Sequence, residues 1–138
     1  RFLEDGHKLV AYLLLVTKAG DIGAYLVGSN FGRHKLIPRI SPNKSVEGAV
    51  GGFIFSIVCA IILSRYYISW MSFSFVLVSG ILIGVFAQVG DLAESLIKRD
   101  YDVKDSSVFL PGLGGMLDVI DSILFTAPIF YICLTIFR

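Results

Sequence analysis

The chain has 138 residues, of which 55% are hydrophobic and 17% are charged, and its mean hydropathy is +0.77. One small soluble core could not bury this much apolar surface, so the composition predicts an all-α, polytopic membrane protein. The formal net charge of +1 provides no field that would attract nucleic acid, and no nucleic-acid partner is expected.

Four apolar segments are expected to form transmembrane helices, since about 20 apolar residues span a bilayer. In chain order they cover residues 9–27, 49–64 (with 68 as an alternative end), 73–90 and 119–137. Lys18 and Asp21 interrupt the first segment, which makes it the least regular of the four.

The connections between the segments indicate how the chain is oriented. Residues 69–72 form a short turn, whereas residues 28–48 and 91–118 form two long polar loops, with turns predicted at 41–44 and 111–115. Four crossings place both long loops on one side of the membrane. These loops hold seven of the basic residues and the opposite side holds four, which predicts that the loops face the cytoplasm.

Acidic residues at membrane depth are the first candidates for chemistry. Asp91 is expected at the end of the third segment, while Asp118 and Asp121 begin the fourth, one helical turn apart. Charges inside a bilayer are costly and usually face a polar cavity. Interfacial acids at helix ends are the alternative, and the helix dipole would favour Asp118 there. If the three carboxylates converge, they would form a site suited to Mg²⁺.

Basic residues and glycines in the two loops fit phosphate chemistry, although cytoplasmic topology alone would also explain the basic residues. The glycines would permit close approach of a phosphate or close packing of helices. A P-loop motif is absent from the sequence. His7 and His34 lack ligand spacing and are interpreted as surface residues, and Cys59 and Cys133 as isolated apolar residues.

Several spaced motifs resemble one family. Ser95-Leu-Ile-Lys98-Arg99, Lys104-Asp105, Pro111-Gly112-x-Gly114-Gly115 and Asp118-x-x-Asp121-Ser122 are similar, in order and spacing, to the C-terminal signature of the CDP-diglyceride synthetases, or phosphatidate cytidylyltransferases. Blocks at residues 21–35, 40–48 and 88–95 are similar to other parts of this family. The chain departs from the family pattern at Leu113 (commonly His), Val119 (commonly Arg), Asn43 (often Lys) and Ser45 (often Thr).

The resemblance implies transfer of CMP from CTP to phosphatidic acid, giving CDP-diacylglycerol and pyrophosphate in phospholipid biosynthesis. It implies Mg²⁺ as cofactor, with a second cation left open. It also implies an integral protein of the bacterial inner membrane, with its active site facing the cytoplasm. Residues 1–138 would be a single catalytic region in the C-terminal part of a longer protein, and a homodimer that completes the cavity is left open.

The resemblance also implies residue roles. The expected metal-binding and catalytic acids are Asp91, Asp118 and Asp121, and the catalytic cations are Lys98 and Arg99. Contacts to CTP and phosphate are expected at the other matched positions: Asp21, Tyr25, Lys35, Ser41, Lys44, Ser45, Glu47, Gly48, Lys104, Asp105, Gly114 and Gly115.

Three other functions remain as alternatives. A CTP-dependent lipid kinase of the polyprenol or phytol type would use the same nucleotide but release CDP rather than pyrophosphate. An inactive membrane scaffold of the same fold would account for Leu113 and Val119. A transporter would suit buried acids, but no internal repeat supports it.

Overall fold

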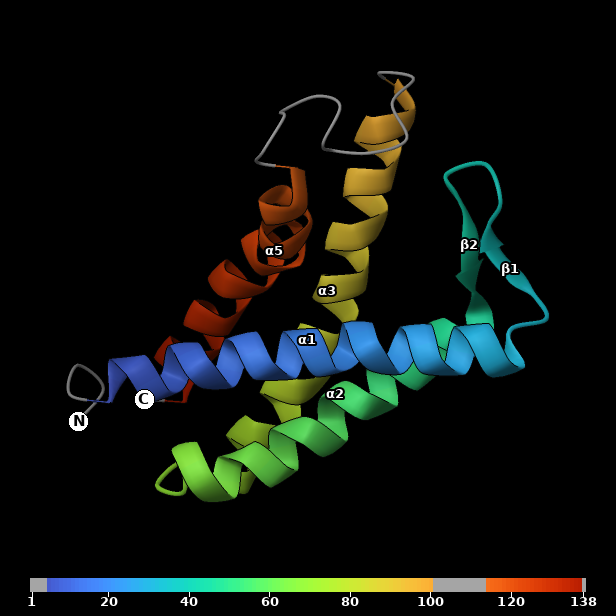
Figure 1. Ribbon diagram of the computed structural model, residues 1–138. Helices are drawn as coiled ribbons and strands as arrows, with labels where there is room; N and C mark the ends of the chain where they lie inside the picture. The colour runs from blue at the N-terminus through green and yellow to red at the C-terminus, as the bar shows by residue number, and fades with distance from the viewer. Residues whose placement is uncertain (1–4, 101–113, 138) are drawn as a thin grey trace.

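The computed structural model describes residues 5–100 and 114–137, with side chains in the second range described from Ile120 onward. Within these ranges the chain is mainly helical (Figure 1). The helices are α1 (Gly6–Phe31), α2 (Val46–Tyr67), α3 (Phe73–Asp100) and α5 (Gly114–Ile136). Between α1 and α2 lies an antiparallel hairpin of β1 (Lys35–Ile37) and β2 (Ser41–Ser45).

The predicted helical membrane class is confirmed. Helices α1, α2 and α3 are each long and apolar enough to cross a bilayer. The apolar part of α5, Ile120–Ile136, is shorter, so the fourth crossing stays a prediction. The sides on which the loops lie also stay a prediction.

Two local predictions are wrong. The loop expected from residue 91 does not begin there, because α3 continues through Asp91 to Asp100. Residues 91–100 contain neither Gly nor Pro, and Lys98 and Arg99 favour the carboxyl end of a helix through its dipole.

The second error concerns the first long loop. Strand β2 occupies residues 41–45, where a turn was expected at 41–44, so the chain is not entirely α-helical. The turn falls instead at residues 38–40, where Ile40 N–H donates to Ile37 O at 3.2 Å. Pro38 favours this position because its ring fixes φ.

Helix α2 begins at a clear capping residue. Ser45 has extended backbone angles, and its hydroxyl oxygen accepts a hydrogen bond from Gly48 N at 3.1 Å. This bond satisfies a main-chain donor that the first helical turn leaves unpaired. Ser45 is therefore both the last residue of the hairpin and the N-cap of α2.

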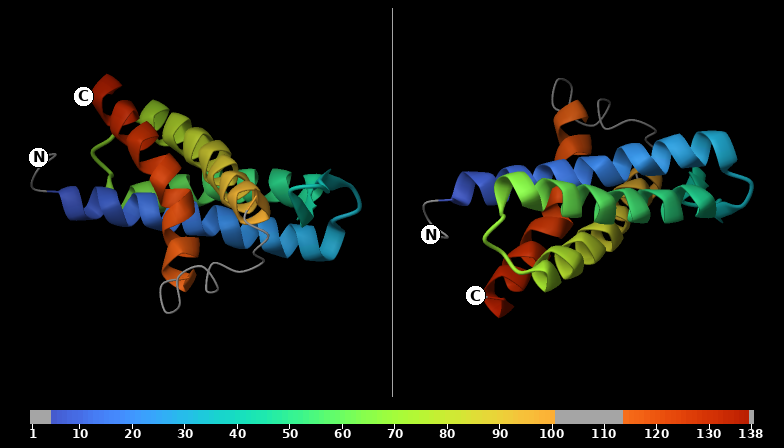
Figure 2. Two further views of the ribbon diagram at one scale, coloured as in Figure 1. Left: turned by 90° about the horizontal axis from the view of Figure 1, so that it is seen from above. Right: turned by 90° about the horizontal axis from the view of Figure 1, so that it is seen from below.

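Helices α1 and α2 run side by side because glycines form their contact (Figures 1 and 2). A Cβ at Gly48 would lie 2.8 Å from Ala24 O, and one at Gly52 would lie 2.7 Å from Gly20 O. Small residues let membrane helices approach closely, since lipid supplies no hydrophobic force to hold them together.

The apolar core lies at the end of the molecule opposite the hairpin. The Tyr12 ring stacks on Phe130 at 5.8 Å between centroids, and Phe75 packs against Phe130 at 5.9 Å. The Tyr12 hydroxyl is hydrogen-bonded to Ser79 Oγ at 3.0 Å. Figure 2 shows the start of α1 and the end of α5 at this end, with the hairpin at the other. The core thus fixes the helices at one end and leaves polar groups to gather at the other.

Candidate active site

A cavity of about 500 Å³ lies where α1, α2, α3 and the hairpin meet. Ligand pockets commonly have volumes of about 300–1,000 Å³, so this cavity could hold a nucleotide-sized molecule. Seven residues predicted from the sequence line it: Asp21, Tyr25, Ser41, Lys44, Ser45, Gly48 and Asp91. The structure therefore brings together residues from three blocks that are far apart in the sequence.

Charged groups from three elements converge in this cavity. Lys44 Nζ, on β2, lies 3.5 Å from Asp91 Oδ2 on α3, and both side chains keep about 30% of their surface exposed. Asp21, on α1, is close enough to both residues to interact with them electrostatically. Asp21 also pairs with Lys18 Nζ at 3.1 Å. The result is a cluster of two carboxylates, Asp21 and Asp91, with Lys44 near both of them and Lys18 paired with Asp21.

A hydroxyl connects this cluster to α5. Ser122 Oγ lies 2.9 Å from Asp91 Oδ1 and 3.0 Å from Asp121 Oδ1, and the Ser122 N–H also donates to Asp121 Oδ1. Asp121 in turn lies beside Glu94. The Ser122 hydroxyl thus links Asp91 on α3 to Asp121 on α5.

The donor atoms present fit a hard divalent cation, because Asp91 and Asp121 offer carboxylate oxygens that converge from two helices. Among the described residues, no group of three or more His, Cys, Asp or Glu side chains has metal-binding geometry. Asp118 belongs to α5, one turn before Asp121, but its side chain lies outside the described residues.

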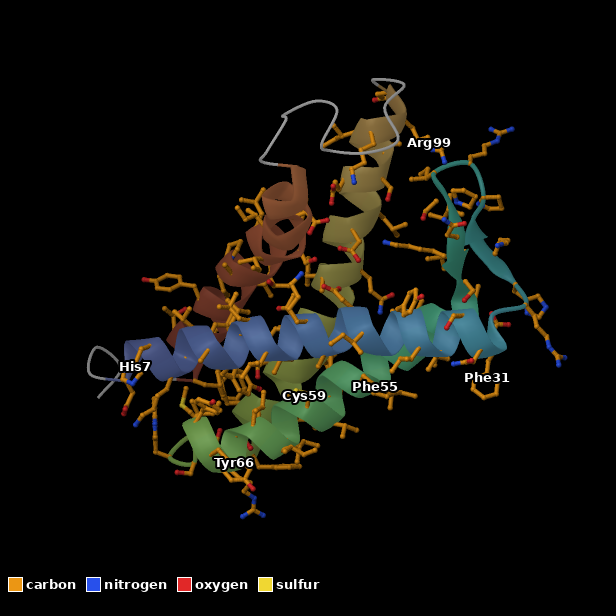
Figure 3. All side chains as sticks on the ribbon, in the orientation of Figure 1. His7, Phe31, Phe55, Cys59, Tyr66 and Arg99 are labelled. Atoms are coloured by element: carbon orange, nitrogen blue, oxygen red, sulfur yellow. The ribbon has the colours of Figure 1, made fainter. Side chains whose placement is uncertain are left out.

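The hairpin is held at its base and near its tip. At the base, Glu47 Oε2 accepts hydrogen bonds from the main-chain N–H groups of Arg33 and His34, each at 3.2 Å, and Glu47 Oε1 lies 2.7 Å from His34 Nδ1. Near the tip, Arg99 Nε donates to Ile40 O at 3.4 Å, and Figure 3 shows Arg99 between the end of α3 and the hairpin. These contacts hold Lys44 over the cavity.

Several predicted site residues do not line the cavity. Lys98 Nζ pairs with Glu94 Oε1 at 2.6 Å, one turn back on α3. Lys35 is exposed on β1, while Glu47 and Arg99 hold the hairpin. Other predicted residues have no described side-chain position: Gly114 and Gly115 begin α5, the side chains of Asp118 and Val119 are not described, and Lys104, Asp105 and Leu113 lie outside the described residues.

Two polar residues of the site had no role assigned from the sequence. Gln88 lines the cavity, and its Nε2 donates to Ala49 O at 2.8 Å, which links α3 to α2. Its position one turn before Asp91 on the same helix face was an available signal. Ser122 follows Asp121 directly, and nothing in the periodicity indicated that its hydroxyl faces α3.

Comparison with known proteins gives consistent matches. A sequence profile of the cytidylyltransferase family matches residues 1–137. A phosphatidate cytidylyltransferase of Bacillus subtilis (strain 168) is 44% identical over 134 residues, which cover 97% of this chain and 50% of that protein. The uncharacterized protein YnbB of Escherichia coli (strain K12) is 43% identical over 129 residues, covering 94% of this chain and 43% of that protein.

A third relative agrees with the first. A phosphatidate cytidylyltransferase of Staphylococcus haemolyticus (strain JCSC1435) is 42% identical over 131 residues, which cover 95% of this chain and 50% of that protein. The chain thus spans about half the length of the curated relatives it matches.

Proposed function

The chain belongs to the cytidylyltransferase family, and we propose that it forms the nucleotide site of a membrane-embedded phosphatidate cytidylyltransferase. The proposed reaction transfers CMP from CTP to phosphatidic acid and releases pyrophosphate. The names and the 42–44% identity of the Bacillus and Staphylococcus relatives support this substrate pair.

The observation that carries the proposal is the meeting of Asp21, Lys44 and Asp91 in one cavity. A triphosphate needs positive charge to bind and closely spaced oxygen ligands for its accompanying metal ion. A cavity that combined only apolar groups would offer neither. The cavity is lined by α1, α2 and α3, which are long and apolar enough to cross a bilayer, so a lipid substrate would have a short path to it.

In the proposed reaction, a phosphate oxygen of phosphatidic acid attacks the α-phosphorus of CTP. A new P–O bond forms, the bond to the bridging oxygen breaks, and the electron pair leaves with pyrophosphate. The Lys44 ammonium would bind phosphate oxygens and balance their negative charge. Gly28 and Gly48 line the cavity where α1 meets α2, and their lack of side chains lets the two helices approach closely at its wall.

Asp91 and Asp121, together with Asp118, would hold Mg²⁺, and adjoining carboxylates would be available to a second cation. When bound, Mg²⁺ would neutralise phosphate charge and orient the triphosphate. Lys98 and Arg99, in the last turn of α3, would provide further positive charge, and we propose the same role for Lys104. We place the hairpin and the end of α3 on the cytoplasmic side of a bacterial inner membrane, where CTP is available.

The test uses the full-length protein in nanodiscs with Mg²⁺, phosphatidic acid and CTP radiolabelled on the α-phosphate. We expect label to enter the lipid phase, to be lost without Mg²⁺ and to be lost in Asp91→Asn. The matched control is Asp100→Asn, an exposed acid on the same helix, which should retain activity.

Two results would contradict the proposal. In a second reaction with a lipid alcohol and CTP labelled on the γ-phosphate, label in the lipid phase, with none from the α-phosphate, would assign the protein as a lipid kinase. If no label enters lipid under any condition, the inactive scaffold becomes the better description.

A further inference from the structure

The side chain of Ser122 occupies the contact between α3 and α5. It is fully buried, and its Oγ lies within 3.0 Å of one carboxylate oxygen on each helix, Asp91 Oδ1 and Asp121 Oδ1. A serine hydroxyl carries one proton and can donate it to one acceptor at a time. Ser122 therefore serves two acids with a single shared donor.

The backbones at this point are closely packed. A Cβ at Gly90 would lie 3.0 Å from Asp121 O and 3.2 Å from the Ser122 Cα. Because Gly90 has no side chain, α5 approaches α3 closely enough for the short serine side chain to reach Asp91. The close approach and the shared hydroxyl together determine how far apart the two carboxylates lie.

The other buried hydroxyl on this part of α5 behaves differently. Thr126, one turn further along, is also fully buried, but its Oγ1 donates to Ile123 O within the same helix at 3.4 Å. Such local bonds are the ordinary way for a hydroxyl to be satisfied inside a membrane helix. Ser122 instead directs its hydroxyl to charged groups on two helices, at the site assigned above to substrate chemistry.

We propose that Ser122 is a positioning residue that holds Asp91 and Asp121 at the separation required to bind a divalent cation between α3 and α5. This inference rests on the proposed function, since it concerns the same acids. Ser122 acts through these carboxylates and needs no contact with the substrate. Hydrogen bonds of this kind orient metal ligands, and their loss typically weakens metal affinity or activity by about 10–100-fold.

The experiment measures Mn²⁺ binding to the full-length protein in nanodiscs by electron paramagnetic resonance, without nucleotide or lipid substrate. Ser122→Ala removes the hydroxyl with little change in volume, and we expect the Kd for Mn²⁺ to rise by about tenfold or more. Thr126→Val is the matched control, because it removes a buried hydroxyl from the same helix, and its Kd should equal that of the wild type. Thermal unfolding of each variant checks folding.

A second substitution separates hydrogen bonding from packing. Ser122→Cys keeps the shape of the side chain but replaces the hydroxyl with a larger thiol that is a much weaker donor, so its affinity should lie below that of the wild type. Wild-type affinity in Ser122→Cys or Ser122→Ala would overturn the inference, as would a wild-type protein that binds no Mn²⁺. A wild-type protein that binds Mn²⁺ but transfers no CMP would overturn the proposed function alone, because the Ser122 comparison does not depend on turnover.

Discussion

Lys44 is the residue on which the positive charge of the cavity depends. It reaches Asp91 from a strand, at 3.5 Å, and both side chains line the cavity. Removing a group that stabilises transferring phosphates commonly lowers the rate by about 100-fold or more. We therefore expect Lys44→Met to lower kcat/KM for CTP by about 100-fold, and Lys44→Arg to restore part of the loss.

Steady-state measurement of CMP transfer to phosphatidic acid checks this prediction. Arg65→Gln is the control, because it removes a cation from the last turn of α2, at the opposite end from the hairpin. Equal losses in Lys44→Met and Arg65→Gln would show that charge in general, rather than the position of Lys44, matters.

Among individual residues, the sequence predicted the charged side chains of the cavity better than the side chains that act through hydrogen bonds. Asp21 and Asp91 were predicted because a charge near apolar segments has few acceptable environments. Lys44 was predicted because basic loop residues fit phosphate chemistry and because its position matches a family motif. Gln88 and Glu47 depend on particular partners, Ala49 and His34, that only the folded chain brings within reach. Choice of partner is a tertiary property, so composition and spacing could not reveal it.

Glu47 holds the hairpin in position. Its carboxylate accepts two main-chain hydrogen bonds and contacts His34 at the base of β1. In Glu47→Ala we expect faster amide hydrogen exchange across residues 35–45 and a higher KM for CTP, because Lys44 would no longer be held over the cavity. Val46→Ala, an exposed neighbour in the same helical turn, is the control. Unchanged exchange in Glu47→Ala would show that the hairpin is held by other contacts.

The contact between α1 and α2 depends on glycine. At Gly52 an added Cβ would meet Gly20 O at 2.7 Å and the Ala24 Cβ at 2.8 Å, so the helices would have to separate. Overpacking of this kind costs about 1–3 kcal/mol, and we expect Gly52→Ala to be less stable by that amount. Gly6→Ala adds the same methyl where nothing lies within 4 Å, and it should not destabilise the protein.

Unfolding of both variants in mixed micelles measures the difference. If Gly52→Ala and Gly6→Ala have the same free energy of unfolding as the wild type, close packing at Gly52 does not hold α1 to α2.

Among the elements, long helices were predictable and the hairpin was not. The helices follow from extended apolar runs. Helices α1 and α2 are centred where they were predicted, whereas α3 extends ten residues past its predicted end at residue 90. Strand β2 has the polar sequence Ser-Pro-Asn-Lys-Ser, which lacks the alternation that identifies a strand. It pairs with β1 in a short irregular register, and this pairing depends on where α1 ends and α2 begins.

For the whole molecule, the proposed orientation predicts which surfaces reagents can reach. The hairpin and the end of α3 contact each other through Arg99 and Ile40, so they should face the same compartment. In a protein whose native Cys59 and Cys133 are replaced, we expect Arg39→Cys to be labelled only from the cytoplasmic side. Arg65→Cys, at the far end of α2, should be labelled only from the opposite side.

A membrane-impermeant thiol reagent applied to intact cells and to inverted vesicles makes this comparison. Labelling of both cysteines from one side would contradict a crossing by α2. Counting apolar segments predicted the class of protein but could not place these surfaces, because α3 continues beyond the predicted boundary and the hairpin folds back over the cavity.

The contact made by Ser122 also determines when during synthesis the site can form. Asp21, Lys44 and Asp91 are made first, but the hydroxyl that joins Asp91 to Asp121 lies on α5, which follows them along the chain. A chain whose synthesis ends before α5 would still contain α1, α2 and α3, which are long and apolar enough to enter the membrane, but Asp91 would lack the hydroxyl and the carboxylate that α5 supplies. Incomplete chains would therefore occupy the bilayer without acquiring the assembled acidic site.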